Sequence, residues 1–354
     1  MISFGETYRG KRVLVTGHTG FKGSWLALWL DALDAEVCGL ALSPTTPSHF
    51  LSIDSQCTSA TVDVRNADRV RDTMTKTRPQ VVFHLAAQAL VRPSYLDPKG
   101  TFDTNVGGTV NVLEAVRTVG GVEAVVVVTS DKCYENDDRD TTYRECDALG
   151  GRDPYSASKG AAEIVAHAYR RSFDGPALAT VRAGNVLGGG DFAMGRLVPD
   201  CIRALTHDLP ITVRNPTSTR PWQHVFDALS GYLWLGARLI EDRGLAGAYN
   251  FGPRSDATVI SVANAMVSAW GSGEVVVDTA IDGLHEARCL RLDCTRANTL
   301  LGWKPVLSKQ EMISYTAEWY KHWARQSDMR KLSLTQLRRY TEQAEKMGLP
   351  WVKA

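Results

Sequence analysis

Two pairs of ionisable side chains in this sequence could move protons. Tyr155 and Lys159 are four residues apart in "PYSASK", so on a helix they share one face. The ammonium can then lower the pKa of the phenol from about 10 toward neutrality and can also hold a cofactor ribose. A phenolate tuned in this way can take the proton from a hydroxyl as hydride leaves the carbon. The second pair, Asp131 and Lys132, sets an acid beside an amine in "TSDKCYEN".

Both pairs stand at the ends of expected secondary-structure elements. The valine run that leads to Asp131 reads as a buried parallel strand, and Tyr155 follows the Asp-Pro start signal of a helix over 155–173. The same alternation runs along the chain, with strands over 12–17, 36–42, 81–87, 124–130 and 177–186 and helices over 20–33 and 105–119. Strands that alternate with helices predict a parallel sheet, and hence a Rossmann-type, doubly wound α/β fold.

Three glycines in the first strand–helix turn indicate a dinucleotide site. Gly17, Gly20 and Gly23 have GxxGxxG spacing in "VLVTGHTGFKGSW". Glycines let the backbone approach a pyrophosphate, and the N-terminus of the helix offers free N–H groups to the anion. A plain glycine-rich turn is the alternative, but the position in the first βαβ unit favours a nucleotide.

The residues that would bind the adenosine part of the dinucleotide are less clear from the sequence. No Asp or Glu follows the second strand, in "ALSPTTP", where an acid would accept from the ribose of NAD, so the residues leave NAD and NADP open. Ser43 could hydrogen-bond that ribose, and Arg65 is too far along the chain to assign to a 2′-phosphate. Asp63 could bind the adenine amino group or cap a helix before Ala67.

The regular alternation of strands and helices ends after residue 186, which indicates a second, smaller domain. A glycine run, a helix, the short strand "ITVR" and a proline-rich link follow. A long apolar helix over 225–242 and "GAYNFGP" are expected to return to the first sheet. The helical tail over 308–348 is expected to cover the smaller domain. We therefore expect a Rossmann domain made of residues 1–186 and 222–252. A smaller α/β substrate-binding domain is expected to be made of residues 187–221 and 253–354.

Composition narrows the class of protein. The 354 residues are 44% hydrophobic and 22% charged with a net charge of +1, which gives no electrostatic reason to expect nucleic-acid or membrane binding. The N-terminus shows no cleavable apolar segment, so we expect a cytoplasmic enzyme with a small-molecule partner. No metal is expected, because no cluster has metal-ligand spacing. Seven cysteines without CxxC spacing are predicted to be reduced and structural: Cys38, Cys57, Cys133, Cys146, Cys201, Cys289 and Cys294.

Several separated motifs occur in the order typical of one enzyme family. "TGHTGFKG", "FHLAAQ", "NVGGTVNVLEA", "TSDKCYEN", "PYSASK" and "RAGNVLGGGD" make the chain similar, over about 11–305, to the extended short-chain dehydrogenase/reductases that act on nucleotide sugars. "TSDKCYEN", "RPWQHVFD" and "HEARCLRLDC" most resemble the 4,6-dehydratases of this family that use CDP-glucose. The resemblance implies an NAD-dependent hydro-lyase of deoxysugar and polysaccharide synthesis. In its closed redox cycle hydride leaves carbon 4 for NAD, water is lost across carbons 5 and 6, and the hydride returns to carbon 6.

The resemblance also implies a role for most of the ionisable residues. Tyr155 would be the base at the carbon 4 hydroxyl, and Lys159 would tune it. Ser130, in preference to the neighbouring Thr129, would hydrogen-bond the same hydroxyl. Asp131 would protonate the departing carbon 6 hydroxyl, which requires a pKa raised by burial or by the substrate.

Lys132 departs from the commoner pattern. The dTDP-glucose dehydratases have a glutamate at this place, which removes the carbon 5 proton. Lys132 would therefore be either a base that has lost its own proton or a cation that stabilises the enolate. A surface Asp-Lys pair without a catalytic role is the alternative.

The cofactor and substrate contacts are implied by the same resemblance. Cofactor contacts are expected from Gly17, Thr19, Gly20, Phe21, Lys22, Gly23, Asp63, Val64, Leu85, Ala86, Ala87, Thr129, Tyr155 and Lys159. Substrate contacts are expected from Gln88, Arg92, Asn185, Arg196, Leu197 and Arg220. Arg196 and Arg220 would clamp the pyrophosphate, because a guanidinium is a permanently charged, bidentate donor. A cation at the start of a helix, as expected for Arg196, also indicates a nearby anion.

Two alternative functions compete with the dehydratase. A 4-epimerase, a reductase or a dehydratase for another nucleotide sugar would share the fold, but an epimerase needs no acid and base for water loss. A nucleotide sensor or scaffold would keep the pocket without turnover, which the intact Tyr155 and Lys159 pair disfavours. The nucleotide base rests on the resemblance alone. A homodimer is also expected from the family, through the helices over 105–119 and 155–173.

Overall fold

A seven-stranded sheet forms the centre of the protein, in a computed structural model that describes residues 2–136, 141–253, 256–278 and 290–353. All neighbouring strands in this sheet are parallel. Their order is β12 (Gly247–Phe251), β7 (Ala177–Ala183), β5 (Ala124–Val128), β4 (Val81–His84), β1 (Arg12–Thr16), β2 (Glu36–Ala41) and β3 (Thr58–Thr61). The predicted α/β fold is confirmed, and "GAYNFGP" supplies the edge strand β12. Cys289, which the sequence assigns to a structural role, lies outside the described residues.

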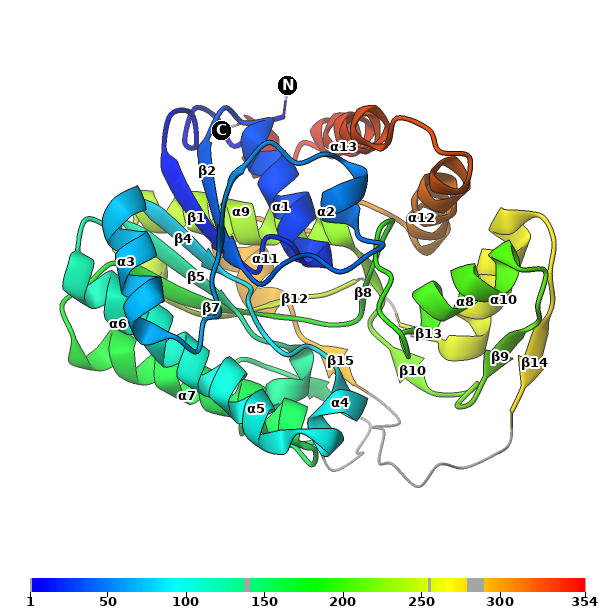
Figure 1. The fold of residues 1–354 in the computed structure, drawn as a ribbon, viewed down its shortest axis with the longest axis horizontal. Coiled ribbons are helices and arrows are strands. Elements are labelled where there is room, and N and C mark those ends of the chain that lie inside the picture. Colours follow the sequence, from blue (N-terminus) through cyan, green and yellow to red (C-terminus); the bar gives the residue numbers. More distant parts are fainter. Residues whose placement is uncertain (1, 137–140, 254–255, 279–289, 354) are drawn as a thin grey trace.

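Helices cover both faces of this sheet, as Figure 1 shows. One face packs against α3 (Ala67–Thr77), α6 (Gly108–Val119) and α7 (Pro154–Ser172). The other packs against α1 (Phe21–Asp31), α9 (Val225–Glu241) and α11 (Thr295–Leu301). Because helices bury the sheet on both sides, the central strands are apolar throughout, and all five residues of β5 are buried. Short helices α2 (His49–Ser52), α4 (Val91–Leu96), α5 (Pro98–Phe102) and η3 (Arg243–Leu245) lie in the connections.

Several predicted elements are shorter in the structure, and the residues they lose become site loops. The strand over 124–130 ends at Val128 and is followed by a 3-10 turn, η2 (Asp131–Cys133), because the Ser130 hydroxyl accepts from the Lys132 N–H and caps the turn. The strand over 177–186 ends at Ala183. A π-helix, η1 (Asp103–Gly107), replaces the first turn of the helix over 105–119.

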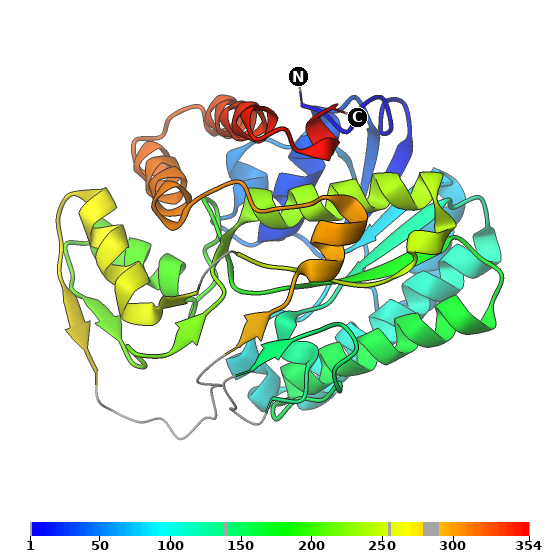
Figure 2. The ribbon, with the colours of Figure 1, turned by 180° about the vertical axis from the view of Figure 1, so that it is seen from behind.

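The smaller α/β region flanks the carboxyl end of the sheet. Among its described residues, the strands form short pairs rather than a large sheet, and helices lie beside them (Figure 2). Its elements are α8 (Leu197–Thr206), α10 (Val259–Trp270) and the pairs β9 (Ile211–Val213) with β14 (Val275–Val277) and β10 (Thr219–Arg220) with β13 (Ala257–Thr258). Two further pairs, β8 (Val186–Leu187) with β11 (Gln223–His224) and β6 (Thr142–Tyr143) with β15 (Arg291–Leu292), connect it to the large sheet's loops.

The C-terminal tail corrects one expectation. It forms α12 (Lys309–Ala324), α13 (Met329–Lys346) and α14 (Pro350–Lys353), and only α12 packs against α10 of the smaller region. The later helices return to the N-terminal part: the ring of Tyr340 meets Trp29 with centroids 5.8 Å apart, and Trp351 stacks on Phe4 at 5.0 Å. Aromatic rings on these helices find apolar partners there, so the tail covers both parts of the protein. Both chain ends therefore lie close together (Figure 1).

Candidate active site

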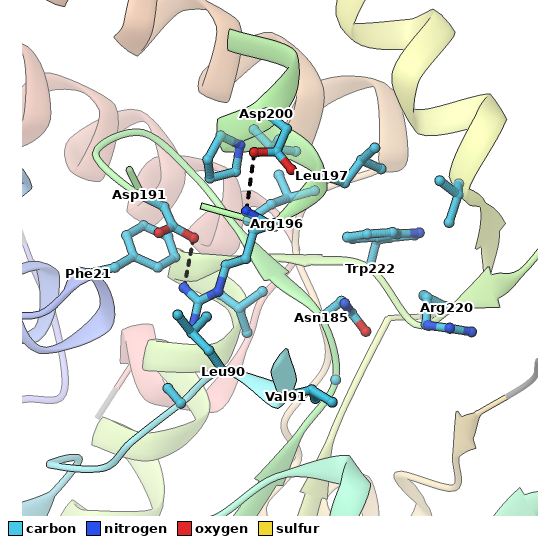
Figure 3. A pocket seen from close by; sticks show the side chains of 18 of the residues that line it. Phe21, Leu90, Val91, Asn185, Asp191, Arg196, Leu197, Asp200, Arg220 and Trp222 are labelled. Atoms are coloured by element: carbon cyan, nitrogen blue, oxygen red, sulfur yellow. Dashed lines mark hydrogen bonds and ion pairs between the residues drawn. The ribbon is translucent and has the colours of Figure 1, made fainter. Parts of the chain in front are cut away.

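A pocket of about 340 Å³ lies between the carboxyl ends of β5 and β7 and the smaller region. Ligand sites in open α/β sheets occur at this edge, where the strands end. Figure 3 shows side chains of both parts of the protein converging on it. The predicted residues that line it are Phe21, Lys22, Arg92, Thr129, Ser130, Asp131, Lys132, Tyr155, Asn185, Arg196, Leu197 and Arg220. The residues from both predicted pairs except Lys159 thus share one cavity.

Asp131 is a buried acid that lines this pocket. Asp131 is 4% exposed, and its Oδ1 accepts from the Ser130 hydroxyl at 3.0 Å. Its Oδ2 is buried with no hydrogen-bond partner among the described residues. Burial raises the pKa of Asp131, although the charge of Lys132 and the Ser130 hydrogen bond lower it. A raised pKa favours the protonated carboxyl that a general acid needs.

Tyr155 differs from the sequence prediction in its protonation. Burial raises the pKa of Tyr155 to about 12, opposed by a hydrogen bond with Ser130. The expected lowering by Lys159 toward neutrality is therefore wrong for this structure, because loss of solvent around the phenol is the largest influence on its pKa. Lys159 is itself buried, its ammonium donates to the Val128 carbonyl at 3.2 Å, and burial lowers its pKa to about 7. Near neutral pH the two side chains together can therefore take up a proton, since Lys159 is partly neutral there.

The hydroxyls before the acid point to different partners. Ser130 bonds both Tyr155 and Asp131, so it lies where a reacting hydroxyl would meet them. The Thr129 hydroxyl instead donates to Glu163 on α7, at 2.5 Å. The geometry thus agrees with the preference for Ser130.

The glycine turn has the shape that a dinucleotide requires. Gly17 has φ of +74°, and a Cβ there would lie 2.8 Å from the backbone nitrogen of Ala86. A Cβ on Gly23 would lie 2.1 Å from the Gly17 carbonyl oxygen. Gly20 is the N-cap of α1 and supplies no side-chain cap, so the first N–H groups of the helix are left for an anion. The turn therefore fits a dinucleotide pyrophosphate.

The neighbouring strand ends hold the other expected cofactor residues. The hydroxyl of Thr19 donates to the Leu42 carbonyl at the end of β2, and the N–H groups of Leu85 and Ala86 donate to Thr16. Contacts of Thr19, Leu85, Ala86, Ala87 and Val64 with a cofactor stay predictions.

Asp63 accepts from the Arg65 guanidinium at 2.6 Å, Oδ2 to Nη2. The helix-cap alternative for Asp63 is wrong, because Asn66 caps α3 by accepting from the Arg69 N–H. Its predicted contact with adenine is left open by this geometry.

Gln88 lies apart from the pocket wall. Its side-chain amide donates to the Leu90 carbonyl and the Thr101 hydroxyl, and its backbone N–H donates to Asn105 in η1. Gln88 thus orders the loop after β4, and a direct contact with substrate stays a prediction. Arg92 follows in α4 and does line the pocket.

Arg196 of the smaller region forms an ion pair with Asp191, which the sequence did not predict. Arg196 is the N-cap of α8, and its Nη1 lies 2.8 Å from Oδ2 of the buried Asp191. The anion that the position of Arg196 indicates is thus supplied within the chain. Asp191 also lines the pocket, and the run "GGGD" was the only signal for it. Arg220 is buried, with Nη1 donating to the Thr219 carbonyl.

Trp222 was also missed by the sequence reasoning. Its indole N–H donates to the Ala257 carbonyl at 3.0 Å, and its ring lines the pocket close to Arg220 (Figure 3). Aromatic residues are common in cores, so its type alone did not mark it as part of the site.

Fold and site together define a dinucleotide-dependent enzyme with a hydride-transfer site next to a buried acid. Residues 13–252 match the family model described as the NAD dependent epimerase/dehydratase family. The chain belongs to this family, and NAD is its cofactor. Among the described residues, no helix is both long and apolar enough to cross a membrane, and no group of three or more possible ligands is arranged for a metal ion.

Individual relatives agree with this assignment. The chain is 46% identical to a CDP-glucose 4,6-dehydratase of Salmonella typhimurium, over 91% of this chain and 94% of that protein. It is 31% identical to a dTDP-glucose 4,6-dehydratase of Streptomyces antibioticus, over 73% and 75% of the two chains. Among solved structures, the Thermus thermophilus UDP-glucose 4-epimerase complex with NAD is 27% identical, with a TM-score of 0.76 over 88% of this chain and 99% of that one.

Replacing Gly23 with alanine is expected to weaken NAD binding by about tenfold or more, equivalent to about 1.4 kcal/mol. The new methyl group would overlap the Gly17 carbonyl and force the turn open. Titration calorimetry with NAD measures the dissociation constant. Gly175→Ala is the control, because its Cβ would meet no atom within 4 Å and it lies outside the glycine turn. Equal affinities of the two variants would show that the close approach at Gly23 does not shape the site.

Proposed function

We propose that this protein is a CDP-D-glucose 4,6-dehydratase, which converts CDP-D-glucose to CDP-4-keto-6-deoxy-D-glucose and water. The proposal rests on one observation above all: the acid–lysine turn of "TSDKCYEN" lines the same pocket as Tyr155 in a chain 46% identical to an enzyme of that name. Tyr155 alone would serve any family member that oxidises a sugar. Asp131 and Lys132 in the same cavity add the groups that loss of water requires.

The glycine turn with Gly17, Gly20 and Gly23 would hold NAD, which would supply the hydride acceptor and donor for the passage from carbon 4 to carbon 6. Ser130 would orient the carbon 4 hydroxyl, and the Tyr155–Lys159 pair would accept its proton. The resulting ketone acidifies the carbon 5 proton. Asp131 would give its proton to the carbon 6 oxygen, so that water leaves as the carbon 5 proton is lost.

Lys132 would support the same step in one of two ways. As a neutral amine it would take the carbon 5 proton; as an ammonium it would stabilise the enolate oxygen, and the carbon 5 proton would pass to solvent water. It lines the pocket beside Asp131, a position that suits both roles.

Arg196 and Arg220 are proposed to hold the nucleotide diphosphate. Both arginines line the cavity, and Figure 3 shows Arg196 beside Phe21 and Asp191, with Arg220 farther along beside Trp222. A bound pyrophosphate would compete with Asp191 for Arg196, because both are anions that accept from the same donor. A homodimer and a cytoplasmic location stay predictions.

Purified protein with NAD should convert CDP-glucose to a 4-keto-6-deoxy sugar without net formation of NADH. In deuterium oxide the product should carry deuterium at carbon 5, because that proton is exchanged during water loss. Mass spectrometry and NMR of the product measure both results. UDP-glucose and dTDP-glucose serve as matched substrates. Conversion of either in place of CDP-glucose would overturn the choice of base, and epimerisation at carbon 4 without deuterium at carbon 5 would overturn the dehydratase.

A further inference from the structure

A buried ion pair lies behind the acid turn, which we define as residues 129–134. Glu163 on α7 and Arg182 on β7 are each 3% exposed, and Glu163 Oε2 lies 2.7 Å from Arg182 Nη2. Neither residue lines the pocket, and the proposed chemistry uses neither. A buried ion pair is weak evidence for stability, because the cost of removing both charges from water offsets their attraction. Its contacts are therefore the better guide to its role.

One contact reaches the beginning of the acid turn. The Thr129 hydroxyl donates to Glu163 Oε1 at 2.5 Å, and the Thr129 N–H donates to the Val181 carbonyl of β7. Thr129 is thus held from the side away from the pocket. The next residue, Ser130, is left to face Tyr155 and Asp131.

The other contact reaches the end of the same turn. Arg182 Nη1 donates to the Tyr134 hydroxyl oxygen at 2.9 Å, and its guanidinium lies 4.8 Å from the centre of that ring. The Tyr134 hydroxyl in turn donates to Asn250 of β12 at 2.7 Å. The planar guanidinium therefore bridges Glu163 and Tyr134, which a lysine at this place could not do in the same geometry.

We propose that the Glu163–Arg182 ion pair is a positioning element that holds both ends of the acid turn and so fixes Asp131 and Lys132 relative to Tyr155. This inference rests on the proposed function, since it assigns the turn its part in water loss. The hydride-transfer residue Tyr155 is carried separately, on α7. Elimination uses two residues of the turn, Asp131 and Lys132, whereas oxidation uses Ser130 of the turn together with Tyr155 outside it. Loosening the turn is therefore expected to slow elimination more than oxidation, and NADH then builds up in the cycle.

Two substitutions loosen one end each without leaving a charge unpaired. Thr129→Val removes the hydroxyl donated to Glu163, and Tyr134→Phe removes the hydroxyl that accepts from Arg182. Thr180→Val is the matched control, because Thr180 on β7 also donates a buried hydroxyl to Glu163, at 2.7 Å, but lies outside the turn.

The first measurement is the fraction of bound cofactor that is reduced at steady state, read by absorbance. Thr129→Val and Tyr134→Phe should slow elimination by about 10- to 100-fold, as expected for a small misplacement of catalytic groups, with KM unchanged. NADH should accumulate in both variants. Thr180→Val should stay within about twofold of the parent protein in the same assay.

The second measurement does not depend on the substrate. Hydrogen exchange followed by mass spectrometry should show faster exchange over 129–136 in Thr129→Val and Tyr134→Phe, and parent-like exchange there in Thr180→Val. If the parent protein leaves CDP-glucose unchanged, the proposed function fails while this comparison still tests the positioning role. If all three variants behave alike in both measurements, the ion pair is structural only and the inference is overturned.

Discussion

Replacing Asp131 with asparagine is expected to slow the loss of water by about 10²- to 10⁴-fold, the usual contribution of a general acid, while oxidation at carbon 4 continues. Asparagine keeps the shape and the hydrogen bond from Ser130 but has no acidic proton for the carbon 6 oxygen. NADH and a 4-keto-glucose nucleotide should therefore accumulate. Rapid-mixing absorbance and product analysis measure the two steps separately.

The matched control for this variant is Asp200→Asn. Asp200 also lines the pocket, but its carboxylate is paired with Arg203 and is far more exposed than that of Asp131. The control should retain the parent rate. Parent-like elimination by the Asp131 variant would exclude this residue as the acid.

The same Asp131 substitution should make the folded protein more stable at neutral pH. Burial raises the pKa of Asp131 above that of the unfolded chain, so its contribution to stability is fully present below the unfolded pKa and is lost as pH rises through the folded pKa. Near neutral pH the native aspartate therefore lowers the free energy of unfolding, and a neutral asparagine removes this destabilisation. The melting temperatures of the parent protein and variant should differ at pH 7 and converge toward low pH.

Replacing Tyr155 with phenylalanine is expected to stop the cycle at its first step, with a loss of about 10²- to 10⁴-fold. Asp131 also bonds Ser130, but the proposed mechanism uses its carboxyl as the acid at carbon 6, so it does not replace the phenol as the base at carbon 4. In contrast to the Asp131 variant, no NADH should accumulate, and CDP-glucose should still bind.

In the parent protein the oxidation step should accelerate as pH rises through about 7, where Lys159 loses its proton and the pair can accept one.

Tyr232→Phe is the matched control for Tyr155. Tyr232 is a buried tyrosine whose hydroxyl has no hydrogen-bond partner among the described residues, so its removal should leave activity within about twofold and should not cost stability. Accumulation of NADH by the Tyr155 variant would contradict its role in oxidation. An oxidation rate that falls as pH rises through about 7 would contradict the proton balance of the pair.

Local patterns were sufficient to predict the fold, and together with the family resemblance they identified twelve of the residues that line the pocket. The buried strand before Asp131 and the helix that starts with Tyr155 are set by short-range preferences, and the parallel sheet brings their ends together. The partners of Arg196 could not be predicted in this way. Asp191 is five residues away, but whether the two side chains meet depends on the turn before α8.

Burial is the property that the sequence conveys least. The spacing of Tyr155 and Lys159 predicts that they share a helix face, but the pKa shifts follow from how completely solvent is removed around them. The same holds for Glu163 and Arg182, which read as ordinary surface charges until β7 and α7 place them together. Tertiary packing decides which side chains are buried and which charges meet, and a short stretch of sequence carries no information about that packing.

The return of the tail to the N-terminal part has a consequence for how the chain matures. Trp351 stacks on Phe4, and the Phe4 N–H donates to the Trp351 carbonyl at 2.8 Å. The apolar surface around Phe4 is thus covered only when residues near Trp351, far along the chain, have docked on it. Contacts between residues so widely separated in sequence form slowly. We therefore expect docking of α14 on the N-terminal residues to be a late step in folding.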